Sequence, residues 1–183
     1  MILPEVKNTT VTLSYLIDQS VLGNRKMQEQ LYLKFATPMF YVCLRYVKHA
    51  QDAEDILQEG FIKVFKNLSN FKNEGSFEGW VRTTMIRTAL SYLRDHKKHT
   101  KHQEPDDTIK DRKSNVFDRL QEKDILHHIT RLPEGCKNIF ILHAIEGYNH
   151  REIAGILGCS EGTCKSQFYR SRGRLQQMLA QSL

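Results

Sequence analysis

The sequence has no long hydrophobic run. None of its 183 residues falls in a stretch approaching the roughly 20 uninterrupted apolar residues that a membrane span needs, and the mean hydropathy is −0.51. The first residues, MILPEVKNTT, lack a basic start followed by a long apolar segment, so they do not resemble a secretory signal. We therefore expect a soluble, cytoplasmic protein without membrane insertion.

Cysteine is scarce, and its spacing argues against structural metal sites. The four cysteines are Cys43, Cys136, Cys159 and Cys164. None forms a CxxC pair, and the separation of Cys159 from Cys164 does not suit a zinc knuckle. Disulfides are not expected in a reduced cytoplasm. The histidines, including the pair His127-His128, supply no complete ligand set and are expected in solvent. We expect no metal and no cofactor.

The sequence also lacks the residue patterns that would indicate an enzyme, since no nucleophile–base set or phosphate-binding loop can be identified. Strand-like alternation and long-period repeats are missing as well, so the expected fold is all-α.

Charged residues, in contrast, are abundant and unevenly distributed along the chain. The chain has 27 Lys+Arg and 21 Asp+Glu, a net charge of +6. Residues 160–174 hold four basic residues and one acid, whereas residues 52–59 hold four acids and no base.

Residues 147–175, GYNHREIAGILGCSEGTCKSQFYRSRGRL, predict two helices joined by a tight turn. Asn149 can cap the first helix, with Glu152 completing a capping box. Gly158 is placed to end that helix in a left-handed conformation, and Ser160 can cap the second helix. The stretch therefore predicts a helix-turn-helix.

The second of these helices has two different faces. Four residues recur at helical spacing and are expected to face inward: Cys164, Phe168, Ser171 and Leu175. The opposite face is small, polar and cationic, and consists of Gly162, Ser166, Tyr169, Arg170 and Gly173, flanked by Lys165, Arg172 and Arg174. Such a face suits the major groove of DNA. Paired amphipathic helices with a glycine turn also occur in ordinary bundles, and this alternative stays open.

Residues 52–68, DAEDILQEGFIKVFKNL, predict a helix with a buried stripe. The stripe consists of Ala53, Ile56, Leu57, Gly60, Phe61, Val64 and Leu68. Another face carries Asp55, Gln58, Glu59 and Ile62. Acids early in a helix suit its dipole, so periodicity alone favours an ordinary solvated helix start. The same face would also suit docking onto a basic partner.

A loop rich in Asn, Gly and Ser, FKNEGSFEGW, precedes a helix expected over about residues 77–95. Phe77 and Trp80 stand at its start. Three arginines follow on the helix: Arg82, Arg87 and Arg94. Aromatic rings beside arginines suit stacking on unpaired bases and binding of phosphates. Alternatively, Phe77 and Trp80 anchor the loop to the core, and for Trp80 we favour this alternative.

Two small helical domains are expected, because residues 94–113 contain one apolar residue among seven Lys/Arg and five acids and cannot bury a core. The domains span residues 13–95 and 117–182, and residues 96–116 form a polar, flexible linker. In the first domain, a helix over 24–47 should kink or break at Thr37-Pro38. In the second, helices over 116–131 and 133–145 precede the helix-turn-helix and make a four-helix domain.

Together these stretches resemble a bacterial RNA polymerase sigma factor of the extracytoplasmic-function (ECF) group. The matching segments are DAEDILQEGFIKVF, SFEGWVRTTMIRTALSYLR and LPEGCKNIFILHAIEGYNHREIAGILGCSEGTCKSQFYRSRGRL, at residues 52–65, 76–94 and 132–175. The resemblance implies a non-catalytic subunit that binds core polymerase, recognises the −10 and −35 promoter elements and supports DNA melting. It implies contacts with the clamp of the largest polymerase subunit and the flap of the second-largest, and an anti-sigma factor as a further partner.

The resemblance also implies roles for individual residues. The residues that would bind the polymerase clamp are Asp55, Gln58, Glu59 and Ile62. Those that would bind the −10 element are Phe77, Trp80, Arg82, Arg87, Thr88, Ser91 and Arg94. Those that would bind the −35 element are Thr163, Lys165, Ser166, Gln167, Tyr169, Arg170, Arg172 and Arg174. Thr88 and Ser91 stand where the family often has Asn and Asp.

A competing hypothesis is a free-standing helix-turn-helix regulator with an N-terminal sensory or dimerisation domain. Such a protein would bind DNA by itself and would have no use for an exposed face formed by Asp55, Gln58 and Glu59. An enzyme is the third hypothesis, and no residue pattern supports it.

Overall fold

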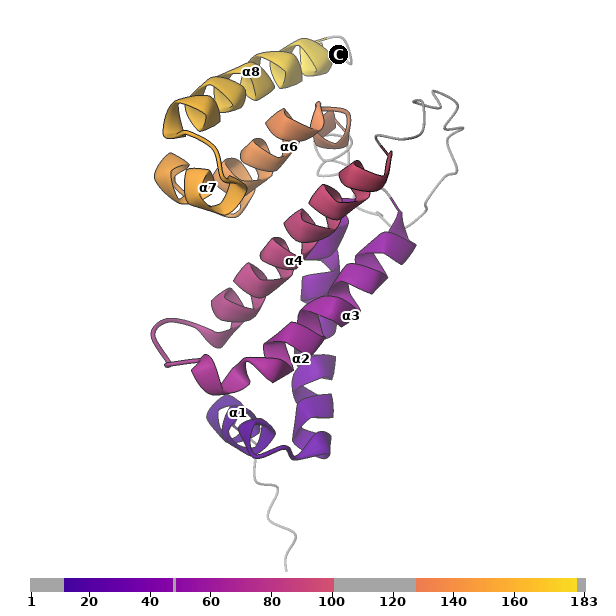
Figure 1. The fold of residues 1–183 in the computed structure, drawn as a ribbon, viewed down its shortest axis with the longest axis vertical. Coiled ribbons are helices and arrows are strands. Elements are labelled where there is room, and N and C mark those ends of the chain that lie inside the picture. The colour runs from indigo at the N-terminus through magenta and orange to yellow at the C-terminus, as the bar shows by residue number, and fades with distance from the viewer. Residues whose placement is uncertain (1–11, 48, 101–127, 181–183) are drawn as a thin grey trace, which may run out of the picture.

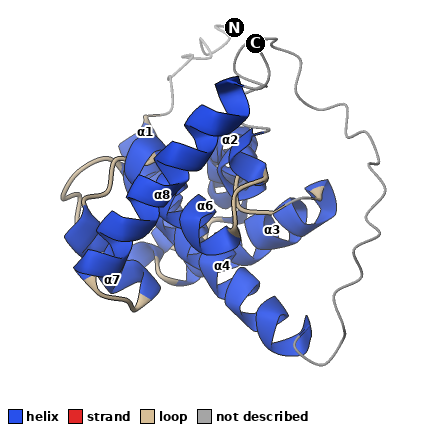
Figure 2. Ribbon diagram, turned by 90° about the horizontal axis from the view of Figure 1, so that it is seen from above, coloured by secondary structure: helices blue, strands red, loops and turns tan. Residues whose placement is uncertain are grey.

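The structure is a computed structural model that describes residues 12–47, 49–100 and 128–180. Within these ranges every regular element is a helix (Figures 1 and 2), which confirms the all-α prediction. Residues 1–11 and most of the predicted linker lie outside the described residues, as does most of the helix predicted over 116–131. Among the helices that are described, none combines the length and the apolar character that crossing a membrane requires.

The N-terminal part contains four α-helices and a 3₁₀ turn. They are α1 (Leu13–Val21), α2 (Arg25–Leu44), α3 (Ala50–Lys66), η1 (Leu68–Asn70) and α4 (Phe77–Thr100). Helices α2, α3 and α4 all pack against one another, and α1 packs against α2 (Figure 1). Helix α4 continues five residues beyond the end that the sequence predicts, into the segment predicted as linker.

Helix α2 runs through Pro38 without a break, so the expected interruption at Thr37-Pro38 does not occur. Proline has no N–H to donate to the carbonyl one turn earlier, and this normally weakens a helix. Here Phe35 and Met39, on either side of the proline, are 5% and 0% exposed. Tertiary packing of this buried face therefore holds the helix together across the missing hydrogen bond.

Helix α3 buries the predicted stripe from Ala53 to Val64 against its neighbours. The helix ends at Lys66, and the last predicted member of the stripe, Leu68, is buried in the 3₁₀ turn η1 that follows. Gly60 lies where α3 meets α4, because a Cβ atom added at this position would collide with the Sδ atom of Met85. The absence of a side chain at Gly60 thus permits the close approach of the two helices.

Replacing Gly60 with valine is expected to destabilise the protein. The added Cβ atom and its two methyl groups would overpack the contact with Met85, which is itself 0% exposed, and overpacking of this kind costs about 1–3 kcal/mol. Thermal unfolding followed by circular dichroism measures the effect. Gly173→Val is the matched control, since nothing lies within 4 Å of a Cβ built there, and we expect a change below about 0.5 kcal/mol. Equal stabilities of the two variants would contradict this account.

The C-terminal part contains α6 (Glu134–Phe140), a π-helical turn η2 (Ile141–Ile145), α7 (His150–Leu157) and α8 (Glu161–Ala180). Helix α8 packs on both α6 and α7 (Figure 2). The helix predicted over 133–145 is therefore α6 continued by a π turn. Of the preceding predicted helix, residues 128–131 are described, and His128–Thr130 are helical. His128 was expected in solvent, and it is buried at 8% exposure.

Candidate nucleic-acid interface

The helix-turn-helix forms with the local contacts that the sequence predicts. The backbone N–H of Glu152 donates to Asn149 Oδ1 at 2.9 Å, and that of Asn149 donates to Glu152 Oε2 at 2.8 Å, which completes the capping box. Gly158 ends α7 with φ of 66°, a left-handed conformation that favours glycine. Ser160 Oγ accepts from the N–H of Thr163 at 3.0 Å. These caps fix the angle at which α8 leaves α7.

The two faces of α8 are oriented as predicted. Cys164 and Ser171 are 0% exposed and Leu175 is 6% exposed, while Phe168 is half-buried and stacks on Phe140 with ring centroids 5.9 Å apart. The residues of the small, polar and cationic face are all exposed: Gly162, Ser166, Tyr169, Arg170 and Gly173. Tyr169 is 79% exposed. Burial of one face of α8 therefore leaves the other available for a partner.

Four residues of the predicted −35 set on α8 already have partners in the chain. Thr163 Oγ1 lies 2.9 Å from Ser160 Oγ, and Ser166 Oγ donates to the carbonyl oxygen of Thr163 at 3.0 Å. Gln167 is half-buried, and its Oε1 accepts from the Cys136 thiol at 2.8 Å, so this side chain is turned inward. Lys165 pairs with Glu161 at 2.7 Å, and hydrogen bonding from Lys165 lowers the pKa of the Glu161 carboxyl. Apart from Gln167, every member of the set is exposed: Thr163, Lys165, Ser166, Tyr169, Arg170, Arg172 and Arg174.

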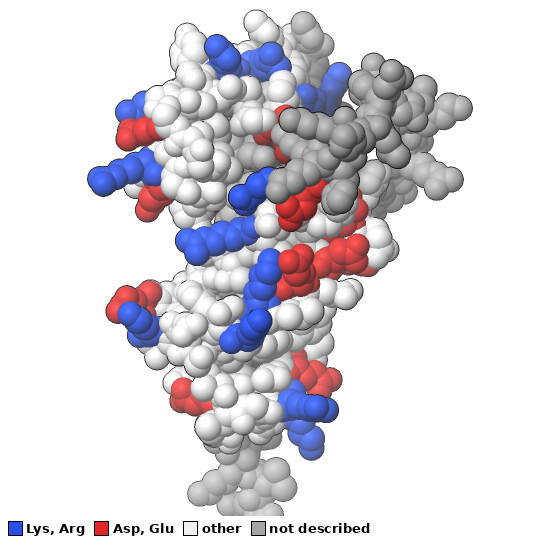
Figure 3. All heavy atoms as spheres, viewed as in Figure 1, with Lys and Arg blue, Asp and Glu red and all other residues white. Residues whose placement is uncertain are grey.

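A second polar surface lies on α3. Asp55, Gln58 and Glu59 are exposed, and Ile62, on the same face, is 66% exposed. Figure 3 shows acidic side chains gathered over α3, beside a row of basic side chains along the middle of the molecule. The start of α3 is tied to α4, because the Tyr92 hydroxyl of α4 donates to Asp52 Oδ1 at 2.9 Å. Burial and this bond raise the pKa of Tyr92 to about 12.

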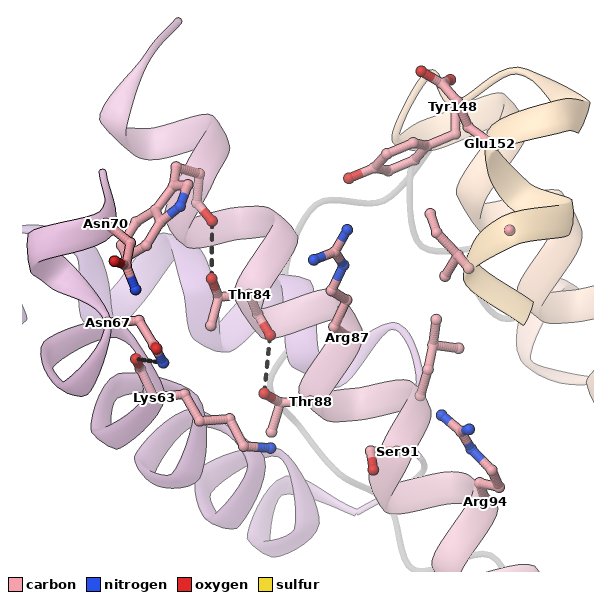
Figure 4. A pocket seen from close by; sticks show the side chains of 14 residues that line it. Lys63, Asn67, Asn70, Thr84, Arg87, Thr88, Ser91, Arg94, Tyr148 and Glu152 are labelled. Atoms are coloured by element: carbon pink, nitrogen blue, oxygen red, sulfur yellow. Dashed lines mark hydrogen bonds between the residues drawn. The ribbon is translucent and has the colours of Figure 1, made fainter. Parts of the chain in front are cut away.

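A third surface is a groove of about 900 Å³ beside α4 (Figure 4). Helix α4 contributes five residues of the predicted −10 set: Trp80, Arg87, Thr88, Ser91 and Arg94. Thr84 and Thr88 bind back to their own helix, donating to the carbonyl oxygens of Trp80 and Thr84 at 3.1 and 2.9 Å. Arg87 and Arg94 are exposed. The groove therefore combines an aromatic ring, hydroxyl groups and two guanidinium groups.

Not all of the predicted −10 residues present their side chains to this groove. Phe77 is 5% exposed and supports Trp80, whose ring lies 5.9 Å from its own between centroids. Phe71 contacts both rings, so the three aromatics anchor the loop, as favoured for Trp80. Thr88 does line the groove, but it is only 1% exposed and its hydroxyl is bonded to the carbonyl oxygen of Thr84. Arg82 lies outside the groove and binds two carboxylates, those of Glu78 and Glu146.

Several residues of the groove could not be found from the sequence. Lys63 lies in α3, Asn67 follows the end of that helix, and Asn70 ends η1. Tyr148, Glu152, Gly155 and Ile156 come from the C-terminal part. Nothing in their spacing indicates a shared site, because the crossing of α3 and α4 and the docking of α7 bring them together. In the described ranges, no group of three or more His, Cys, Asp or Glu side chains is placed to hold a metal ion.

Comparison with known proteins identifies the family to which the chain belongs. Two family profiles match the chain: Sigma-70 region 2 over residues 31–99 and Sigma-70, region 4 over residues 123–175. The RNA polymerase sigma-H factor of Pseudomonas aeruginosa is 27% identical over 177 residues, which cover 90% of this chain and 92% of that protein. The RNA polymerase sigma factor SigV of Bacillus subtilis is 32% identical over 133 residues, covering 72% and 79%.

Solved structures share the fold. The sigma factor RpoE from Bartonella quintana, in complex with the anti-sigma factor NepR, superposes with a TM-score of 0.59 at 21% identity and covers 83% of this chain and 96% of its own. CnrH, in complex with the cytosolic domain of CnrY, gives 0.55 at 21% identity and covers 92% and 97%. From the two matched regions and the full-length relatives, the chain belongs to the sigma-70 family of RNA polymerase sigma factors, in its extracytoplasmic-function group.

Proposed function

We propose that this sigma factor reads promoters with two separate surfaces. Residues 13–95 bind core polymerase and the −10 element, residues 117–182 read the −35 element, and residues 96–116 link the two domains. The observation that carries the proposal is the gathering of Trp80, Arg87 and Arg94 in one groove, apart from the exposed basic face of α8. The protein acts in the cytoplasm as an initiation factor, without catalytic residues or a cofactor.

At the −10 element, the groove beside α4 receives a base that has left the stack. The half-buried ring of Trp80 offers a surface on which a base can stack, since every base has a π-face. The exposed guanidinium groups of Arg87 and Arg94 neutralise the neighbouring phosphates. Ser91 is half-buried in the same groove and offers a hydroxyl to the base. Binding an unpaired base in this way favours the melted duplex.

At the −35 element, α8 enters the major groove. Arg170 and Lys165 donate to guanine edges or to phosphates, and Tyr169 lies between them on the exposed face. Ser166 and the first backbone N–H groups of α8 hold a phosphate at the helix start. Thr163, Arg172 and Arg174 flank this face and fix the register of the helix on the DNA.

The polymerase contacts are distributed over both domains. The α3 face formed by Asp55, Gln58, Glu59 and Ile62 docks on the clamp of the largest subunit, and the C-terminal domain docks on the flap of the second-largest. Each contact can be weak by itself, because linked sites raise one another's effective concentration. An anti-sigma factor, like the one bound in the RpoE structure, is a further partner and would block these surfaces.

Run-off transcription with core polymerase on a promoter library tests the proposal. We expect transcripts only when the chain and core polymerase are both present, and sequence preferences confined to a −10 and a −35 block. Trp80→Ala should flatten the preference in the −10 block and leave the −35 block unchanged, whereas Arg25→Ala, on the exposed start of α2, should alter neither. A chain that binds specific DNA alone and supports no transcription would instead favour the free-standing regulator.

A further inference from the structure

Glu146 joins the two domains. It follows the π turn η2 in the C-terminal part, yet its side chain is only 1% exposed. Its Oε1 accepts from Arg45 Nη1 at 2.6 Å, and its Oε2 accepts from Arg82 Nη1 at 3.3 Å. Arg45 ends α2 and Arg82 lies in α4. One carboxylate thus bridges two arginines of the other domain.

Two more polar contacts cross between the domains beside Glu146. Lys137 is 7% exposed, and its Nζ donates to the carbonyl oxygen of Tyr46 at 2.7 Å. The hydroxyl groups of Thr83 and Tyr148 lie 3.1 Å apart. We call these contacts, together with the Glu146 bridge, the interdomain latch. Because buried polar and charged groups need partners, the latch specifies one docked arrangement of the two domains.

The docked arrangement places α7 over the groove beside α4. Tyr148, Glu152, Gly155 and Ile156 form the wall of the groove opposite α4, and Figure 4 shows Arg87 extending from α4 toward Tyr148. Arg82 is engaged as well. Burial alone would lower its pKa, but hydrogen bonds from its guanidinium to Glu78 and Glu146 outweigh burial and raise it. Guanidinium groups of the −10 surface therefore face the C-terminal domain.

We propose that the interdomain latch closes the free protein over its own −10 surface, so that the C-terminal domain and promoter DNA compete for the same face of α4. This inference rests on the −10 role proposed above. Opening replaces the contacts of Glu146 with water and releases Arg82 for phosphate. The two domains can separate reversibly, because the desolvation of the buried charges offsets much of the attraction between them. The open fraction then limits the apparent affinity for DNA.

The test compares two carboxylate-to-amide variants of the full chain. Glu146→Gln weakens both arginine contacts across the interface. Glu78→Gln is the matched control, since Glu78 binds the same Arg82 from within α4 and is itself 52% exposed. Small-angle X-ray scattering measures the radius of gyration. Fluorescence anisotropy measures the binding of a single-stranded oligonucleotide carrying the non-template −10 sequence that the promoter library selects.

For Glu146→Gln we expect a larger radius of gyration and about tenfold tighter oligonucleotide binding, as for a wild type that is open in roughly one molecule in ten. Glu78→Gln should match the wild type in both measurements. Tyr148→Phe removes only the hydroxyl contact with Thr83, and it should change both quantities in the same direction by less. If circular dichroism shows that Glu146→Gln does not fold, this milder variant tests the latch in its place.

Each contrary outcome is distinct. An unchanged radius of gyration in folded Glu146→Gln and Tyr148→Phe would overturn the latch, even if the wild type binds the oligonucleotide. A larger radius with unchanged affinity would overturn the competition with DNA. Equal effects of Glu78→Gln and Glu146→Gln would show that the gain in affinity comes from freeing Arg82 of a carboxylate and not from separation of the domains. If the oligonucleotide binds neither wild type nor variant, the −10 role of the groove fails, and the competition fails with it.

Discussion

Reversing the charge of the α3 face, with Asp55→Lys and Glu59→Lys together, is expected to abolish transcription by core polymerase. Both residues are exposed, and Glu59 has one ion pair, with Lys63 at 2.6 Å. An exposed pair of this kind contributes little to stability, so the fold should survive. At an interface with a basic clamp, however, like charges brought together cost several kcal/mol, which corresponds to a loss of at least about 100-fold in affinity.

Retention of the labelled chain on core polymerase and the yield of run-off transcript measure this loss. The matched control is Glu29→Lys with Asp18→Lys, which makes the same charge change at exposed positions of α1 and α2 and should leave both readouts at the wild-type level. Full retention of the α3 variant would remove the clamp role from this face. It would also leave its exposed Ile62, at 66% exposure, without an assigned partner.

Removing the guanidinium of α8 with Arg170→Ala is expected to weaken −35-dependent transcription by about 5- to 150-fold, because one side chain donating to a guanine edge contributes about 1–3 kcal/mol of discrimination. Arg170 lies on the exposed face of α8 and away from the buried Ser171, so the helix itself should be unaffected. The loss should be largest on the promoter with the preferred −35 sequence and should vanish on one with that element scrambled.

Arg172→Ala distinguishes base recognition from phosphate binding. Arg172 is an exposed residue of the same helix but lies on its flank, so its loss should weaken transcription about equally on all −35 sequences and reduce the dependence on salt. Comparison of the two variants over a series of −35 substitutions is the measurement. If Arg170→Ala also acts uniformly over the series, Arg170 binds the backbone, and base reading on α8 must come from other side chains.

The helix-turn-helix could be predicted residue by residue because its determinants are local. Capping by Asn149 and Ser160 depends on side chains that reach only three residues along the chain, and the conformation of Gly158 depends on its lack of a Cβ. The buried stripe of α3 is similarly encoded in one helix, since its period matches the helical turn.

Features that depend on contacts between distant segments could not be predicted. The sequence indicates a weak point at Pro38, and only the burial of Phe35 and Met39 explains why α2 continues through it. The buried contacts of Glu146 could not be predicted either, because an acidic residue before a glycine is typical of a solvated turn. Its partners lie 101 and 64 residues away along the chain, and no local pattern reports a contact of that range.

The π turn η2, over Ile141–Ile145, sets the angle about the axis of α6 at which the chain continues toward α7 and α8. Each residue of a regular helix advances the chain by about 100° around the axis, and a π turn accommodates one additional residue without ending the helix. Deleting one residue there would preserve the internal geometry of α7 and α8 and rotate them as a unit relative to α6. The orientation of Glu146 toward α2 and α4 is thus set by the length of a five-residue segment that contributes no residue to the groove or to the exposed face of α8.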